Sequence, residues 1–357
     1  MAVTAFRQAR AAILEALGEP LAIDTVTLPE IKPGQVLVDL AYSGVCHTQL
    51  LEARGKRGPD RFLPHTLGHE GSGTVREVGP GVKKVKPGDR VVLTWIRGEG
   101  LDVAGTTYTR SSGSVNSDAI STFMSATLTC ESRVVPIPQA MPLREAALLG
   151  CAVPTGAGIL FNAARLEPGS SVAIFGVGGI GLSALLAADL LLARTVIAVD
   201  IVDAKLETAA RSGATHTINA QREDPLARIR EITGQRGVDV AIECAGRRQT
   251  MQAAFRSVRD KGGLCILAGN LPAGEEISID PMDLIRGKRI AGTWGGETRP
   301  DRDIPLYADL YLAGKLKLDT LITHEVDLDG LNGVLVALEK GEVGRALVRF
   351  EPVRLES

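Results

Sequence analysis

Short apolar runs alternate with longer stretches of helical character between residues 171 and 268. The short runs predict strands at 172–175, 195–199, 215–218, 238–242 and 263–268. The longer stretches between them predict helices at 179–193, 203–212, 224–234 and 248–259. Strands and helices that alternate in this way are typical of a doubly wound parallel sheet, so we predict an α/β fold for this part of the chain.

The pattern is different before residue 135. Residues 35–40 alternate between apolar and polar positions, residues 85–92 read as a turn that runs into a strand, and residues 133–137 form another short apolar run. No long helical period separates them, which favours a β-barrel-like domain. Short mixed elements return after about residue 296 and end in the apolar run 346–350. We therefore expect one domain built from 1–152 and 296–357, with the α/β domain 153–295 inserted into it.

The segment 97–118 is polar and rich in glycine and serine. Such composition is typical of surface connections, so an exposed loop is expected here.

Composition narrows the class of protein. The chain has 357 residues, 45% of them hydrophobic and 23% charged, with a net charge of −2. These values are ordinary for a soluble two-domain protein and do not indicate a nucleic-acid or membrane partner. The five cysteines are scattered and odd in number, which disfavours a disulfide framework. The first residues lack the apolar core of a signal peptide, and the sequence has no run long enough to span a membrane, so a cytoplasmic location is expected.

A glycine motif follows the first predicted strand of the α/β domain: Gly176-Val177-Gly178-Gly179-Ile180-Gly181. Between a strand and a helix, the first glycine permits a tight turn, the second allows the backbone to approach a pyrophosphate, and the third allows close packing. Asp200 ends the next strand, where its carboxylate can bind ribose hydroxyls and repel a 2′-phosphate. The pattern predicts a dinucleotide site that favours NAD over NADP. The alternative is a glycine-rich turn in another α/β protein.

Three residues are candidate metal ligands: Cys46, His69 and Cys151. Two thiolates and one imidazole leave the fourth position of a tetrahedral zinc open, as in catalytic sites. Their spacing does not establish a site, because a single cysteine is often a small buried side chain and a single histidine is often packed or solvated.

These residues stand in motifs that resemble the zinc-dependent alcohol dehydrogenases of the medium-chain dehydrogenase/reductase family. The motifs occur in that family's order and cover nearly the whole chain; they are Cys46-His47-Thr48, Gly68-His69-Glu70-Gly71-Ser72-Gly73, Lys86-Pro87-Gly88-Asp89-Arg90-Val91, Leu149-Gly150-Cys151, the glycine motif, Leu321-Ile322-Thr323-His324 and Gly344-Arg345-Ala346. The branch with the liver-type and glutathione-dependent formaldehyde dehydrogenases is the most similar. The resemblance implies a GroES-like β-barrel catalytic domain and a Rossmann NAD-binding domain.

The resemblance also implies roles around the metal. Cys46, His69 and Cys151 would hold one catalytic zinc. Glu70 would lie behind the metal and coordinate it during ligand exchange, or it would be a carboxylate satisfied by a nearby base. Thr48 would bind the substrate oxygen and begin proton release, unless it is an ordinary hydroxyl on a turn.

Further roles concern the cofactor. His47 and Arg345 would meet the NAD pyrophosphate, Thr155 would touch the nicotinamide, and Lys205 would approach the adenosine ribose. The alternatives for His47 and Lys205 are solvated side chains. Trp95 and Trp294 would line the substrate pocket, or they would be core residues.

The chain departs from the pattern of the family it resembles in three places. No cysteine lies between Trp95 and Cys130, so a four-cysteine structural zinc site cannot form and one zinc per chain is expected. Gln49 stands where an aspartate usually orients the ligating histidine. Leu51 replaces a histidine that ends the proton relay in some relatives, so proton release must take another route. Cys130, Cys244 and Cys265 have no metal partners in the sequence, and the last two are expected to be buried thiols.

The leading hypothesis is reversible, zinc-assisted hydride transfer between an alcohol, or the matching aldehyde or ketone, and NAD(H), in a homodimer or homotetramer. One alternative is glutathione-dependent formaldehyde oxidation, for which the loop 97–118 offers no firm cation to hold the glutathione carboxylates; Arg97 and Arg110 are possibilities. The other is a non-catalytic nucleotide-binding relative, which the intact ligand set disfavours.

Overall fold

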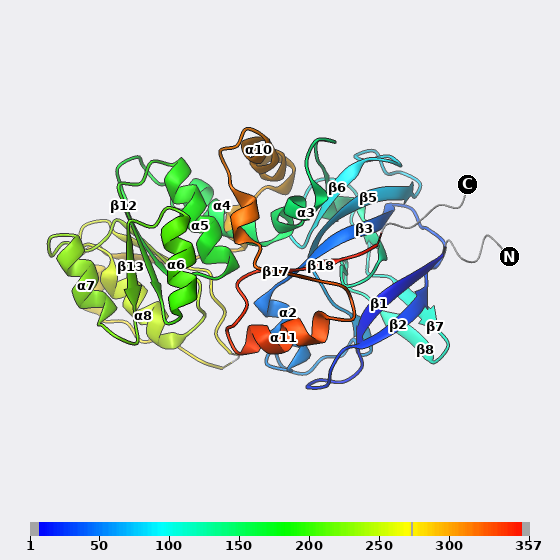
Figure 1. Cartoon of the computed structure of the whole chain (residues 1–357), viewed down its shortest axis with the longest axis horizontal. Helices are drawn as coiled ribbons and strands as arrows, with labels where there is room; N and C mark the ends of the chain where they lie inside the picture. The colour runs from blue at the N-terminus through cyan, green and yellow to red at the C-terminus, as the bar shows by residue number, and fades with distance from the viewer. Residues whose placement is uncertain (1–6, 273, 352–357) are drawn as a thin grey trace. The chain divides into compact units, whose positions relative to one another are not determined.

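The computed structural model describes residues 7–272 and 274–351. They divide into two compact units (Figure 1). The first unit contains the chain up to Cys151, together with Arg299–Gly314 and the residues from Ile322 onward. The second contains Ala152–Thr298 and Lys315–Leu321.

The first unit is built on β-sheet. A closed barrel runs in the order β1 (Gln8–Leu14), β2 (Ala22–Thr27), β7 (Thr107–Arg110), β8 (Gly113–Asn116) and β4 (His65–Thr66). A seven-stranded sheet runs in the order β10 (Val134–Pro136), β6 (Arg90–Thr94), β5 (Glu70–Val78), β3 (Gln35–Val45), β18 (Ala346–Arg349) and β17 (His324–Val326), with β9 (Ala126–Cys130) also paired to β3. The predicted β-barrel domain is confirmed.

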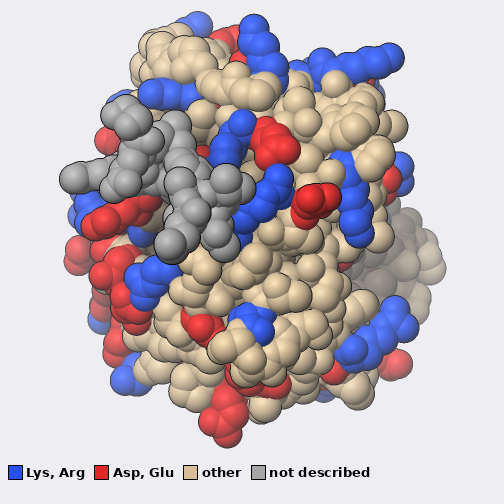
Figure 2. Space-filling view, turned by 90° about the vertical axis from the view of Figure 1, so that its right-hand side faces the viewer, with Lys and Arg blue, Asp and Glu red and all other residues tan. Residues whose placement is uncertain are grey.

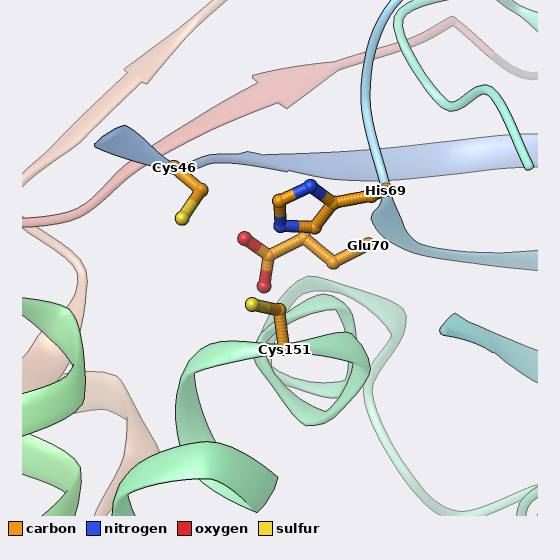
Figure 3. A group of neighbouring side chains, drawn as sticks. All are labelled: Cys46, His69, Glu70 and Cys151. Carbon is orange, nitrogen blue, oxygen red and sulfur yellow. The ribbon is translucent and has the colours of Figure 1, made fainter. Parts of the chain in front are cut away.

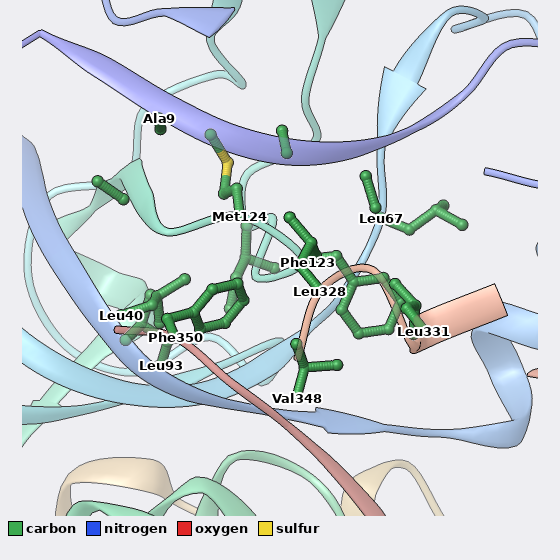
Figure 4. Packing of buried hydrophobic residues seen from close by; sticks show 14 of the residues in the cluster. Ala9, Leu40, Leu67, Leu93, Phe123, Met124, Leu328, Leu331, Val348 and Phe350 are labelled. Carbon is green, nitrogen blue, oxygen red and sulfur yellow. The ribbon is translucent and has the colours of Figure 1, made fainter. Parts of the chain in front are cut away.

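The core of this unit joins residues from both ends of the chain. Leu40, Phe123 and Met124 pack in one buried cluster with Leu331 and Phe350 (Figure 4). Burial of such side chains contributes about 1.5–3 kcal/mol each, so the C-terminal residues are integral to the fold of this unit.

Short helices connect the strands of the first unit. Helix α2 (His47–Ala53) begins directly after β3, and η2 (Ala147–Gly150) follows α3 (Leu143–Ala146). The other helical elements are η1 (Glu131–Arg133), α10 (Pro300–Leu312) and α11 (Leu331–Glu339).

Most of the segment 97–118 is exposed, as expected, but the expectation of a loop was wrong for its second half. Strands β7 and β8 form a hairpin there, in which Tyr108 pairs with Val115 and both side chains are fully buried. The Tyr108 hydroxyl accepts a hydrogen bond from the Leu128 backbone N–H at 3.2 Å. The many glycines and serines of the segment favoured a loop in the sequence analysis, although Tyr108 and Val115 are the two inward-facing positions of a hairpin.

The second unit is a six-stranded parallel sheet. Its order is β13 (His216–Asn219), β12 (Thr195–Asp200), β11 (Ser171–Phe175), β14 (Val240–Glu243), β15 (Leu264–Leu267) and β16 (Arg289–Gly292). The helices that accompany it are α4 (Ala152–Gly158), which continues as a π-helical turn (Ile159–Ala163), α5 (Gly179–Leu190), α6 (Asp203–Arg211), α7 (Pro225–Ile232), α8 (Arg248–Ser257), α9 (Pro281–Ile285), η4 (Gly295–Glu297) and η5 (Leu318–Leu321). The strand order reverses beside β11, which is where ligands bind in open α/β sheets. The predicted doubly wound parallel sheet is confirmed.

Across the described ranges, no single helix is both long and apolar enough to cross a membrane, although the consecutive segments 143–150 and 152–163 pass that test together on length and composition. Basic and acidic side chains are interspersed on the face of the molecule that Figure 2 shows.

Candidate functional site

Cys46, His69, Glu70 and Cys151 come together in the first unit. One ligand atom from each lies within 4.8 Å of all the others. Figure 3 shows the two sulfurs, the imidazole and the carboxylate turned toward one another. Cys46 occupies the junction of β3 and α2, His69 and Glu70 stand at the start of β5, and Cys151 follows η2. The fold thus joins residues that are far apart in the sequence, as the zinc hypothesis requires.

Two glycines make room for Glu70. A Cβ atom on Gly44 would lie 2.6 Å from the Glu70 carboxyl carbon, and one on Gly150 would lie 2.7 Å from Glu70 Cβ and 2.3 Å from the Leu93 carbonyl oxygen. Real Cβ atoms essentially never approach so closely. Glycine at both positions is therefore a requirement of this centre, and the sequence analysis did not single it out.

Glu70 and Arg345 form a buried ion pair. Glu70 Oε1 accepts a hydrogen bond from Arg345 Nη2, and Arg345 Nη1 donates to the Val45 carbonyl at 3.3 Å. Burial lowers the pKa of Arg345. Glu70 Oε2 is buried without a hydrogen-bond partner. Glu70 is thus satisfied by a base on one oxygen, while the other remains available.

The thiol of Cys46 is prepared to act as a ligand. A hydrogen bond from Cys151 and the proximity of His69 hold the pKa of Cys46 well below its usual value, against the effect of burial. A thiolate is the form of cysteine that binds a metal. Thr48 Oγ1 lies 3.8 Å from Cys46 Sγ, at the edge of the same group.

His69 is oriented from two sides. Gln49 Nε2 contacts His69 Nδ1, and the Trp95 ring stands edge-on to the imidazole, with ring centroids 6.4 Å apart. His69 Nε2 is buried and has no hydrogen-bond partner. A free imidazole nitrogen, a free carboxylate oxygen and two thiols form a donor set that fits zinc.

The glycine motif forms the turn between β11 and α5. Gly176 has φ +89°, a left-handed conformation that favours glycine. A Cβ on Gly178 would meet nothing within 4 Å, whereas one on Gly181 would lie 2.1 Å from the Gly176 carbonyl oxygen. The turn therefore has a first glycine in the left-handed region, an open second glycine and a tightly packed third.

Asp200 ends β12 next to this turn. Asp200 Oδ2 accepts a hydrogen bond from Val177 N–H at 2.9 Å, and Oδ1 accepts from Ile201 N–H at 2.8 Å and Val202 N–H at 3.1 Å. The carboxylate is thus fixed at the carboxyl end of the sheet.

The other predicted residues have varied surroundings. Thr155 is buried in the second unit, and its hydroxyl has no hydrogen-bond partner. Lys205 is half-buried on α6, and His47 is exposed at the start of α2. Trp294 is 74% exposed, which rules out core packing for this side chain.

All five cysteines are free thiols, as the sequence analysis expected. Cys265 is fully buried, and burial raises its pKa to about 12. Cys130 is also buried, whereas Cys244 is only half-buried.

Comparisons with known proteins agree with this geometry. Residues 32–144 match the family model for the alcohol dehydrogenase GroES-like domain, and residues 179–312 match the model for zinc-binding dehydrogenases. The chain is 34% identical to an S-(hydroxymethyl)glutathione dehydrogenase from Paracoccus denitrificans, over 96% of this chain and 99% of the relative.

Solved structures give the same result. An alcohol dehydrogenase zinc-binding domain protein from Burkholderia ambifaria superposes with a TM-score of 0.90 at 32% identity, covering 97% of this chain and 99% of the other. Benzyl alcohol dehydrogenase from Acinetobacter calcoaceticus superposes with a TM-score of 0.88 at 31% identity, covering 96% and 99%. The chain therefore belongs to the medium-chain dehydrogenase/reductase family and is a zinc-dependent, nicotinamide-linked alcohol dehydrogenase.

Proposed function

We propose that this enzyme interconverts alcohols and the matching aldehydes or ketones with NAD(H), at one zinc held by Cys46, His69 and Cys151. The observation that carries the proposal is the convergence of two thiols, a free imidazole nitrogen and a free carboxylate oxygen within 4.8 Å. Zinc, when bound, supplies a Lewis acid that lowers the pKa of an alcohol hydroxyl, and the nicotinamide supplies the hydride acceptor.

Thr48 is the residue that we assign to the alcohol proton. Its hydroxyl neighbours the Cys46 ligand, and a hydroxyl can accept one proton while it donates another. Leu51 has no group that exchanges protons, so Thr48 passes its proton to water. Trp95, edge-on to His69, is the proposed wall of the substrate pocket in the first unit. The exposed Trp294 is a second candidate substrate contact.

NAD rather than NADP is the proposed cofactor. The Asp200 carboxylate, fixed by three backbone N–H groups, accepts hydrogen bonds from the ribose hydroxyls and repels a 2′-phosphate. The open side of Gly178, with Gly179 and Ile180 after it at the start of α5, receives the pyrophosphate. The partnerless Thr155 hydroxyl is the proposed nicotinamide contact, Lys205 the proposed ribose contact, and His47 and Arg345 the proposed pyrophosphate contacts.

The zinc of Cys46, His69 and Cys151 is the only one that we propose. The segment after Trp95, where related enzymes often carry a second zinc, is held here by Glu131. Its carboxylate accepts hydrogen bonds from the backbone N–H groups of Lys83, Lys84 and Leu101 at 2.6, 2.7 and 2.8 Å. These bonds support the proposal that this lobe needs no metal.

Ordinary alcohols are favoured over the glutathione adduct as substrates. Glutathione carboxylates would need free cations, but Arg110 is paired with Glu15 and Asp24 and is 9% exposed. The other candidate, Arg97, is paired with Asp102 at 3.3 Å.

A homo-oligomer is also proposed. Strand β16 is an edge of the parallel sheet, and the apolar side chains of Met282, Leu284, Ile285 and Trp294 are exposed near it. An unpaired strand edge with apolar neighbours favours association. The five free thiols support a cytoplasmic location.

Metal analysis and a substrate panel test the proposal together. We expect about one zinc per chain. Aliphatic and aromatic alcohols are offered with NAD, with and without glutathione, while NADH absorbance is followed. Cys46→Ser should abolish turnover while NAD still binds, and Cys265→Ser is the matched control. Activity that needs glutathione would contradict the substrate class, and a fully active Cys46→Ser protein would contradict the zinc assignment.

A further inference from the structure

Gln49 contacts two of the proposed zinc ligands. Its Oε1 accepts a hydrogen bond from the backbone N–H of Cys46 at 3.0 Å, and its Nε2 contacts Nδ1 of His69. Gln49 is 1% exposed, so its amide faces these two partners and not bulk water.

The direction of the second contact decides where the imidazole carries its proton. An amide has one oxygen that accepts and one NH₂ group that donates. With NH₂ facing it, Nδ1 is an acceptor, and the neutral ring then carries its proton on Nε2. An imidazole that binds a metal through Nε2 instead carries its proton on Nδ1, which becomes a donor.

Zinc loading therefore gives Gln49 two donors to satisfy with one oxygen. If Oε1 turns to the Nδ1–H of His69, the NH₂ group faces the N–H of Cys46, and that amide loses its acceptor. If the present orientation persists, the Nδ1–H of His69 faces a donor. In both cases one donor that faces the buried Gln49 amide is left without a partner, and this disfavours the loaded state. A carboxylate at the same place would accept from both donors.

We propose that Gln49 is a positioning residue that makes the zinc of this enzyme exchangeable: on loading, its amide reverses toward His69 and the Cys46 N–H is left without an acceptor. The inference rests on the zinc site proposed above, because it requires His69 Nε2 to be the ligand atom.

Gln49→Glu is the first test, since glutamate has the same shape and carries two acceptor oxygens. We expect the zinc dissociation constant to fall at least about tenfold, which is the lower end of the change in metal affinity caused by groups that orient metal ligands. Competition with a chromophoric chelator measures this constant. Gln35→Glu is the matched control. Gln35 is a second buried glutamine of the first unit, whose amide contacts Lys32 N–H and Thr106 Oγ1, and its substitution should leave the zinc affinity unchanged.

The added charge of a glutamate would itself attract zinc, so the second readout follows the hydrogen bond alone. We expect hydrogen exchange of the Cys46 amide to accelerate at least about tenfold when zinc is loaded onto the wild-type protein, because its acceptor turns away. In Gln49→Glu the amide should stay protected with and without zinc.

Unchanged zinc affinity in Gln49→Glu, or a Cys46 amide that stays protected in the zinc-loaded wild type, would overturn this inference and leave the zinc site intact. Failure of both proteins to take up zinc would instead overturn the proposed function, and this inference with it.

Discussion

Arg345 and Glu70, 275 positions apart in the sequence, meet as an ion pair in which the arginine side chain is 5% exposed and the glutamate side chain is fully buried. A buried charge without its partner is far less stable than the pair, because it has lost its hydration without compensation. The pair thus couples the last strand of the sheet to the carboxylate of the metal centre.

Removing only one partner should therefore be costly. We expect Glu70→Leu to lower the free energy of unfolding by about 3–5 kcal/mol, since it leaves the Arg345 guanidinium buried and alone. The double variant Glu70→Leu/Arg345→Leu should recover much of this loss, because no unpaired charge remains. Urea denaturation of Glu70→Leu, Arg345→Leu and the double variant measures the coupling. Strictly additive losses would show that the two side chains do not depend on each other.

Gly44→Ala should disturb the metal centre, although it adds only one methyl group. The new Cβ would lie 2.6 Å from the Glu70 carboxyl carbon, so the carboxylate must move. We expect at least a tenfold weaker zinc affinity, the size of effect seen when groups around metal ligands are displaced. Gly333→Ala, on α11 with nothing within 4 Å of its new Cβ, is the control and should bind zinc normally. Normal zinc binding by Gly44→Ala would mean that Glu70 has more freedom than the packing indicates.

Asp200→Asn should relax the choice of cofactor. The substitution removes the charge that repels a 2′-phosphate and keeps an oxygen to accept from the Ile201 and Val202 N–H groups. We expect the ratio of kcat/KM for NADP to that for NAD to rise at least tenfold, about 1.4 kcal/mol. Asp203→Asn removes an exposed carboxylate at the start of α6 and should leave the ratio unchanged. An unaltered ratio in Asp200→Asn would place cofactor selection elsewhere.

Glu131→Gln should lower stability in a pH-dependent way. Burial raises the pKa of Glu131. The hydrogen bonds from the backbone N–H groups of Leu101, Lys83 and Lys84 together lower it by more, so the net shift is downward. A carboxylate whose pKa is lower in the folded state than in the unfolded state contributes to stability. The contribution is complete at pH values above the unfolded-state pKa, and it is lost as pH falls through the folded-state pKa. We expect a loss of about 1.5–3 kcal/mol at pH 7 that shrinks below about pH 4.3.

Urea denaturation across that pH range measures the Glu131 effect, with the exposed Glu19→Gln as the matched control. A pH-independent difference between Glu131→Gln and the wild type would contradict the role of its charge.

The parallel sheet was the most predictable part of the molecule, because β11, β12, β14 and β15 are local apolar runs. Strand β16 was not predicted, since its sequence Arg-Ile-Ala-Gly is not such a run. Predicted helices extended too far at their ends: the helix expected at 179–193 ends at Leu190. The hairpin of β7 and β8 escaped prediction because only Tyr108 and Val115 mark its inner face.

Site residues could be predicted from the sequence where they belong to a recognisable motif. Cys46, His69, Glu70 and Cys151 do lie together, but only the resemblance to a family joined them, since no local pattern relates positions so far apart. The packing of Gly44 against Glu70 and the double contact of Gln49 depend on tertiary neighbours, and the sequence carries no local signal for them.

The pairing of β18 with β3 sets the order in which this centre can be completed during synthesis. Val45, next to the first ligand, pairs with Ala346, and Arg345 reaches it across 300 positions. All three proposed ligands leave the ribosome long before that strand does. A nascent chain thus holds its thiols and Glu70 before the Arg345 guanidinium that pairs with Glu70 exists, so the buried centre is complete only after β18 has been synthesised.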